Sequence, residues 1–146
     1  MEQTYAIELK NITKRFGKIV ANDGINLKVK RGEILSLLGE NGSGKTTLMN
    51  MISGIYFPDE GRILVDGKAV SIRSPKDSFD LGIGMIHQHF KLIDVMTAAE
   101  NIILGLKGNA VLDMKKVHKD IQELVDRYGF DLDPAQKVYT MSVSQK

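Results

Sequence analysis

The sequence predicts an α/β domain, with strands dominating its first third and helices its last third. Three observations carry this expectation. Residues 5–38 hold three apolar or alternating stretches of strand length. A glycine-rich loop, GENGSGKT at 39–46, separates the last of them from a helical pattern. From residue 97 onward, apolar residues recur at helical spacing behind helix-capping residues.

The composition is that of one globular domain. The chain has 146 residues, 42% hydrophobic and 26% charged, and no cysteine, which excludes disulfides and thiolate metal sites. No apolar run reaches the ~18 residues that span a bilayer, and Met1-Glu2-Gln3 does not open a signal peptide, so we expect a cytosolic chain.

The charge is nearly balanced. A formal net charge of +2 gives no reason to expect nucleic acid as a partner. Basic residues nevertheless gather near the N-terminus, which indicates either a solvated sheet face or a field that collects an anionic nucleotide. They are Lys10, Lys14, Arg15, Lys18, Lys28, Lys30 and Arg31, with only Asp23 against them.

Strands are expected where apolar residues alternate or run together between turn residues. Ile34–Leu38 is almost continuously apolar, which is typical of a strand buried on both faces. Arg62–Val65 lies between the turn Pro58–Gly61 and an Asp66-Gly67 pair that is typical of a hairpin turn. The segments are Tyr5–Leu9, Ile25–Val29, Ile34–Leu38, Arg62–Val65 and, as a further candidate, Ile83–Ile86.

Three helices are predicted. The first opens directly after the glycine-rich loop, runs over residues 45–53 and ends at Gly54. Thr97-Ala98-Ala99-Glu100 is a capping box for a helix that runs to Gly105. Asp113 caps the third, which Gly129 stops. Its apolar residues at helical spacing are Met114, Val117, Ile121, Leu124, Val125 and Tyr128.

The glycine-rich loop fits the phosphate-binding pattern G-x-x-x-x-G-K-[ST], with an apolar run before it and a helix after it. Glycines let successive N–H groups turn inward as an anion nest, and the helix N-terminus adds its dipole. Lys45 can reach the outer phosphates, and the Thr46 hydroxyl can ligate magnesium. We therefore expect the loop to hold the phosphates of a nucleotide through Gly39, Asn41, Gly42, Ser43, Gly44, Lys45, Thr46 and Thr47.

A phosphate loop alone leaves several functions open. A small kinase usually carries this loop on its first strand, whereas here more than thirty strand-rich residues precede it. A GTPase needs an Asn-Lys-x-Asp guanine reader, which is absent, and Asp126-Arg127-Tyr128-Gly129 reads as the end of a helix. Ile63-Leu64-Val65-Asp66 resembles a strand that ends in a magnesium-binding aspartate, but Gly67 favours a hairpin turn.

Taken together, these segments resemble the nucleotide-binding subunit of an ATP-binding-cassette (ABC) transporter over nearly the whole chain. KNITKRFGKIVANDGINLKVKRGEILSLLGENGSGKTTLMNMISG is similar to the opening of that family, which places Phe16 where an aromatic ring stacks on adenine. Stacking is reasonable chemistry for Phe16, and the alternative is a core phenylalanine at a strand end. The resemblance implies an incomplete ABC-type cassette of the P-loop NTPase fold, with an antiparallel β edge and a helical subdomain.

Two further segments carry the resemblance. GIGMIHQHFKLIDVMTAAENIILG resembles the Q-loop, whose glutamine, Gln88 here, lies near magnesium and the attacking water, while its loop contacts the membrane subunit. MSVSQK resembles the start of the signature motif Leu-Ser-Gly-Gly-Gln, which meets the γ-phosphate held by a partner domain. Ser142 and Gln145 match it, whereas Val143 and Ser144 replace two glycines and weaken the expected backbone approach.

Within the family, the sequence around GMIHQHFKL is most similar to that of sugar and nucleoside importers that carry two cassettes in one chain. We expect an ATP-binding core at 1–91 and a helical subdomain at 92–146. The implied cofactors are ATP and Mg²⁺, and the implied partners are transmembrane permease subunits and a second nucleotide-binding domain at the cytoplasmic face of the membrane. The rivals are a stand-alone phosphotransferase and a non-catalytic nucleotide-binding module.

ATP hydrolysis by these residues alone is expected to be weak. The reaction needs one carboxylate for the water shell of magnesium and another to orient or deprotonate the attacking water. In the family, these groups and a histidine that meets the γ-phosphate come from segments after the signature motif. ATPase activity is therefore expected of the complete protein.

Overall fold

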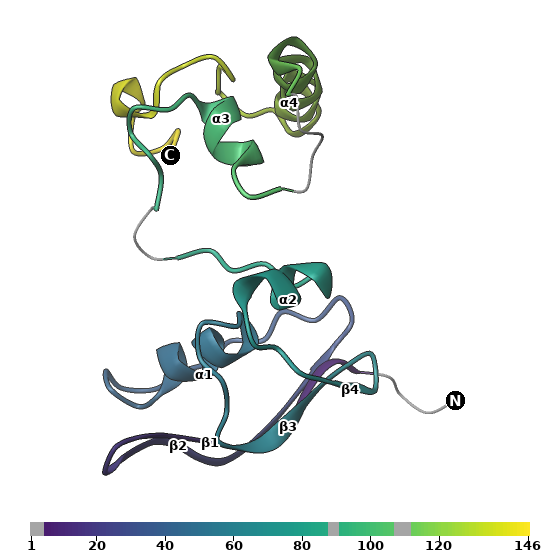
Figure 1. The fold of residues 1–146 in the computed structure, drawn as a ribbon, viewed down its shortest axis with the longest axis vertical. Helices are drawn as coiled ribbons and strands as arrows, with labels where there is room; N and C mark the ends of the chain where they lie inside the picture. The colour runs from purple at the N-terminus through teal and green to yellow at the C-terminus, as the bar shows by residue number, and fades with distance from the viewer. Residues whose placement is uncertain (1–4, 88–90, 107–111) are drawn as a thin grey trace. The chain divides into compact units, whose positions relative to one another are not determined.

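Residues 5–87, 91–106 and 112–146 are described by a computed structural model and divide into two units, Met1–Ile86 and His87–Lys146 (Figure 1). Within these ranges, every helix is too short or too polar to cross a membrane.

The first unit is built on a four-stranded antiparallel sheet with the order β2-β1-β3-β4. The long strands β1 (Tyr5–Phe16) and β2 (Ile19–Lys30) form a hairpin, and β3 (Glu60–Val65) and β4 (Lys68–Val70) form a second one. In the central strand, Leu9 pairs with Leu27 on one side and with Ile63 on the other. The expected antiparallel edge is confirmed, and its predicted strands lie inside these longer ones.

Two helices complete this unit. The helix α1 (Lys45–Ile52) follows the glycine-rich loop, and Ser53 and Gly54 end it close to the predicted position. The helix α2 (Pro75–Asp80) begins at Ser74, whose side chain accepts a hydrogen bond from the Asp77 N–H. One apolar core joins α1 to the inner face of the sheet, and it is formed by Leu9, Ile12, Leu48, Met51, Ile52, Ile63 and Ile72. This packing fixes the start of α1 against β1 and β2.

The second unit is mainly helical, as predicted. The Thr97 capping box opens α3 (Ala98–Ile103), and both of its reciprocal hydrogen bonds are present. Asp113 caps α4 (Met114–Tyr128), which Gly129 ends in the left-handed conformation, and a 3₁₀ turn, η1 (Val138–Thr140), follows. Ile121 and Val125 of α4 pack against Ala99 of α3.

Two strand predictions are wrong. Residues 34–38 form no strand, and Ile34 and Leu38 are 96% and 89% exposed. Residues 83–86 also form no strand, and Ile86 is 95% exposed. An apolar strand is held by backbone hydrogen bonds to neighbouring strands. Among the described residues, the sheet contains only β1 to β4, so nothing pairs with these runs.

Candidate functional site

The glycine-rich loop ends in a helix N-terminus that is open to an anion. Gly42 and Gly44 have φ values of 85° and 86°, which glycine adopts without strain. Gly44 is the N-cap of α1, and it offers no side chain to the free N–H groups of the first turn. That turn also holds no acidic residue, so its dipole attracts anions without local competition.

Lys45 brings its ammonium group to the same loop. Its Nζ donates to the carbonyl oxygens of Gly39 and Glu40, both at 2.7 Å, and to the Ser43 Oγ at 3.2 Å. The positive charge therefore lies over the loop. A phosphate oxygen that enters the nest would meet both the backbone N–H groups and this ammonium.

The remaining predicted loop residues surround these two features. Asn41, Gly42 and Ser43 are exposed, as is Thr46 in the first turn of α1, whereas Thr47 is half-buried. A hydroxyl at the Thr46 position is accessible to a hydrated cation beside the loop. Across the described part of the chain, no group of three or more His, Cys, Asp or Glu side chains is placed to hold a metal.

The loop rests on β2 through a contact that the sequence did not reveal. The Asn22 Nδ2 donates to the Gly44 carbonyl oxygen at 3.3 Å, and Asn22 is only 6% exposed. A β-carbon on Gly44 would lie 2.3 Å from the Ala21 carbonyl oxygen and 2.8 Å from the Asn22 Nδ2. Glycine is thus required at position 44 both by its φ and by the close approach of β2.

Phe16, the predicted base-stacking residue, lies at the end of β1. It pairs with Ile19 across the Gly17-Lys18 turn and is 42% exposed, so it is not a core phenylalanine. Its ring meets the Tyr56 ring edge-to-face with centroids 5.1 Å apart, and the Lys14 Nζ lies 5.5 Å from its centroid. The sequence did not identify Tyr56, because nothing in the residues next to it predicts a contact with a ring 40 residues earlier in the chain.

Asp66 occupies a hairpin turn, as predicted. It has a φ of 49° and links β3 to β4 together with Gly67. Its carboxylate accepts from the Arg31 guanidinium at 2.6 Å. The alternative role of a magnesium-binding residue at a strand end is not supported by this geometry.

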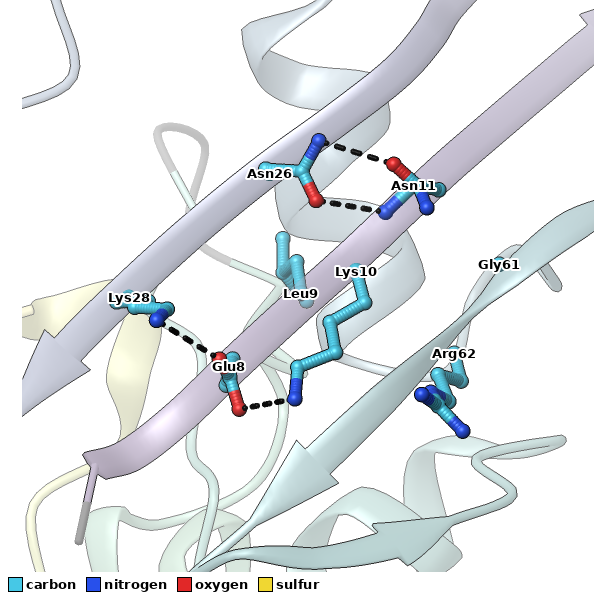
Figure 2. Close-up of a pocket in the computed structure, with 8 residues that line it drawn as sticks. All are labelled: Glu8, Leu9, Lys10, Asn11, Asn26, Lys28, Gly61 and Arg62. Carbon is cyan, nitrogen blue, oxygen red and sulfur yellow. Dashed lines mark hydrogen bonds and ion pairs between the residues drawn. The ribbon is translucent and has the colours of Figure 1, made fainter. Parts of the chain in front are cut away.

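A separate hollow of about 650 Å³ lies on the sheet face away from α1 (Figure 2), because Glu8, Lys10 and Arg62 in its lining alternate with the core residues Leu9 and Ile63. Glu8 lies between the Lys10 and Lys28 ammonium groups, at 3.0 and 3.3 Å, and Asn11 and Asn26 form a side-chain pair. The hydrogen bond and charge of Lys10, and to a smaller extent those of Lys28, hold the pKa of the Glu8 carboxyl below its usual value. Five of the seven clustered basic residues form ion pairs, which favours the solvated-face interpretation: Lys10, Lys14, Arg15, Lys28 and Arg31.

Residues 22–146, which include the whole phosphate loop, match the ABC transporter family. The chain belongs to this family.

Relatives of this ABC transporter chain are import ATP-binding proteins, which confirms the resemblance predicted from the sequence. The chain is 51% identical, over 97% of its length, to the guanosine import ATP-binding protein NupO of Bacillus subtilis. It is 49% identical, over its full length, to the nucleoside import ATP-binding protein NupA of Lactococcus lactis. It spans 28% and 29% of the lengths of these two relatives.

Solved ABC cassettes share the fold. The ADP conformation of MJ1267, an ATP-binding cassette of an ABC transporter, has a TM-score of 0.80 at 26% identity, covering 97% of this chain and 60% of that one. The dimeric structure of MJ0796, a bacterial ABC transporter cassette, has a TM-score of 0.74 at 30% identity, covering 95% and 64%. The predicted class, an α/β phosphate-loop domain of the ABC type, is confirmed.

The signature-like end of this ABC transporter chain forms a turn. The Ser142 N–H donates to the Gln145 Oε1 at 3.0 Å, and the Gln145 Nε2 donates to the Asp131 carbonyl oxygen at 3.2 Å. Ser142 and Ser144 share a hydroxyl hydrogen bond of 2.9 Å, and Val143 is exposed. These contacts order Ser142 and Gln145 within the second unit, and their predicted contact with a γ-phosphate stays a prediction.

The Q-loop glutamine, Gln88, lies outside the described residues, as do His89 and Phe90. The following residues, Lys91 to Val95, are exposed. Exposure is what a segment that contacts a membrane subunit requires, and it agrees with the prediction for this part of the loop.

Proposed function

We propose that this chain binds MgATP at its phosphate loop and, within a complete transporter, couples ATP hydrolysis to the import of a nucleoside or sugar. The observation that carries the proposal is the open N-terminus of α1, with Lys45 held over it by two carbonyls. That combination suits a chain of phosphates, because N–H groups, dipole and ammonium all act on one anion.

Different residues around the loop would bind the phosphates, the magnesium and the base of the nucleotide. The loop N–H groups, from Gly39 to Thr47, bind the phosphates, and Lys45 neutralises their outer charge. Magnesium, when bound, would supply positive charge beside the phosphates. Thr46 would hold it with its hydroxyl, and Gln88 is proposed as a further ligand that also orients the attacking water. Phe16 is proposed to stack on the base.

The partners follow from the same proposal. Transmembrane permease subunits would contact residues 88–95, and the Ser142–Gln145 segment would meet the nucleotide held by a second nucleotide-binding domain. The helical subdomain at 92–146 would then sit against the permease, while the core at 1–91 holds ATP. With these partners, the chain would lie at the cytoplasmic face of the membrane.

A nucleoside is the better supported solute. The two relatives with 51% and 49% identity are named for guanosine and nucleoside import. Relatives named for glucose or ribose import are 41% and 40% identical. Uptake of labelled guanosine and ribose by cells with and without the gene would test this choice, and loss of ribose uptake alone would reverse it.

The binding proposal is tested by titrating the purified chain with ATP and magnesium. Losing a charge-assisted hydrogen bond costs roughly 1.5–3 kcal/mol, so Lys45→Ala is expected to weaken ATP binding about ten- to a hundredfold. Lys68→Ala, an exposed lysine of β4 in the same unit, is the matched control and should leave affinity unchanged. Equal affinity in Lys45→Ala and the unsubstituted chain would reject the assignment.

A further inference from the structure

The exposed ring of Phe16 is held by one short segment, residues 56–60, that follows α1. Phe16 is the last residue of β1, and it precedes a two-residue turn that leaves its side chain half in solvent. Tyr56 meets the Phe16 ring at an interplanar angle of 71°. An edge-to-face contact of this kind limits how the ring can tilt.

Asp59 of the same segment fixes the backbone just before that ring. Its Oδ2 accepts from the Arg15 N–H at 2.6 Å, its Oδ1 accepts from the Lys14 Nζ at 2.9 Å, and its own N–H donates to the Thr13 carbonyl. Arg15 pairs with Val20 of β2 on one side, but β3 begins only at Glu60, so on the other side the Asp59 carboxylate accepts the Arg15 N–H. The Arg15 N–H and then Lys14 hold the pKa of the Asp59 carboxyl below its usual value, so the carboxylate stays ionised further into the acid range than a free aspartate.

Asp59 also places a charge beside the ring. The Lys14 ammonium that it binds lies 5.5 Å from the Phe16 centroid, within the range of a cation–π interaction. One carboxylate therefore orders both the main chain before Phe16 and the cation near its ring. Tyr56 and Asp59 leave the half-exposed Phe16 ring in a defined orientation before any ligand arrives.

We propose that Tyr56 and Asp59 are positioning residues that orient Phe16 for stacking on a nucleotide base. This inference rests on the proposed function, because it assigns the ring its ligand. A ring orientation that is already set removes part of the ordering cost of stacking, and so raises affinity for the base-bearing nucleotide. It adds nothing to the binding of a phosphate chain that carries no base.

The experiment compares two probes on the full chain, MgATP and magnesium tripolyphosphate, by calorimetric titration. Tyr56→Leu, Asp59→Asn and Phe16→Ala should each weaken ATP binding about threefold to tenfold. The same variants should leave tripolyphosphate binding unchanged. Tyr56→Phe keeps the ring edge and should bind ATP as the unsubstituted chain does. Tyr139→Leu, an exposed tyrosine of the second unit, is the matched control and should change neither affinity.

The two probes separate this inference from the proposed function. If neither probe binds the unsubstituted chain, the proposed nucleotide site fails. If Phe16→Ala weakens ATP binding and neither Tyr56→Leu nor Asp59→Asn does, stacking stands and the positioning role is overturned. If these two variants weaken both probes equally, they act on the unit as a whole, which also overturns it.

Discussion

Replacing Gly44 by alanine tests whether the close approach of β2 to the phosphate loop holds the start of α1. Two costs are expected. The φ of 86° forces alanine into the left-handed region, at about 1–2 kcal/mol. The new β-carbon would also lie 2.3 Å from the Ala21 carbonyl oxygen, so the backbone must shift, at a further cost of about 1–3 kcal/mol.

Gly42→Ala is the matched control. Its φ is 85°, so it pays the same conformational cost, but nothing lies within 4 Å of its added β-carbon. Urea unfolding without nucleotide, followed by circular dichroism, should therefore show Gly44→Ala to be less stable than Gly42→Ala by about 1–3 kcal/mol. Equal midpoints for the two variants would refute the reasoning, because the contact with β2 would then contribute nothing.

Four further outcomes are expected. ATP and GTP should compete within about tenfold, because stacking on Phe16 does not read the edge of the base, and strong exclusion of GTP would argue for an adenine-reading pocket. Phosphate release from ATP by the chain alone should equal that of the Lys45→Ala variant. If the chain instead hydrolyses ATP and Asp66→Asn abolishes that activity, Asp66 is a magnesium ligand. The hydrogen bond from the Thr97 N–H lowers the pKa of the Glu100 carboxyl, so the stability that this cap contributes is complete above the usual carboxyl pKa and is lost as the pH falls through the lowered pKa. Glu100→Ala should therefore reduce the dependence of the unfolding free energy on pH in the acid range, and an unchanged dependence would contradict this. Cysteines at Leu92 and Val95 should cross-link to the permease in the intact transporter, and free labelling without cross-links would place the coupling surface elsewhere.

The sequence by itself determined the features that depend on residues close together in the chain. The structure agrees with the predicted start of α1 after the glycine-rich loop, the Asp66-Gly67 hairpin, the Thr97 capping box and the ends of α4 at Asp113 and Gly129. Each is set by backbone conformations and hydrogen bonds within a few residues, so local residue types suffice to predict it. The order of apolar segments also predicted the α/β class, and the resemblance of the quoted segments to known cassettes predicted the family.

Only the tertiary structure decided what lies beside these local features. Ile34–Leu38 has the composition of a buried strand, but a strand needs hydrogen-bonded neighbours, and none of the described segments supplies them. Asn22 and Asp59 reach their partners across 22 and 44 residues of sequence, respectively. Tyr56, in the loop after α1, likewise meets the ring of Phe16 at the end of β1. No local pattern encodes these contacts, because packing of α1 on the sheet creates them.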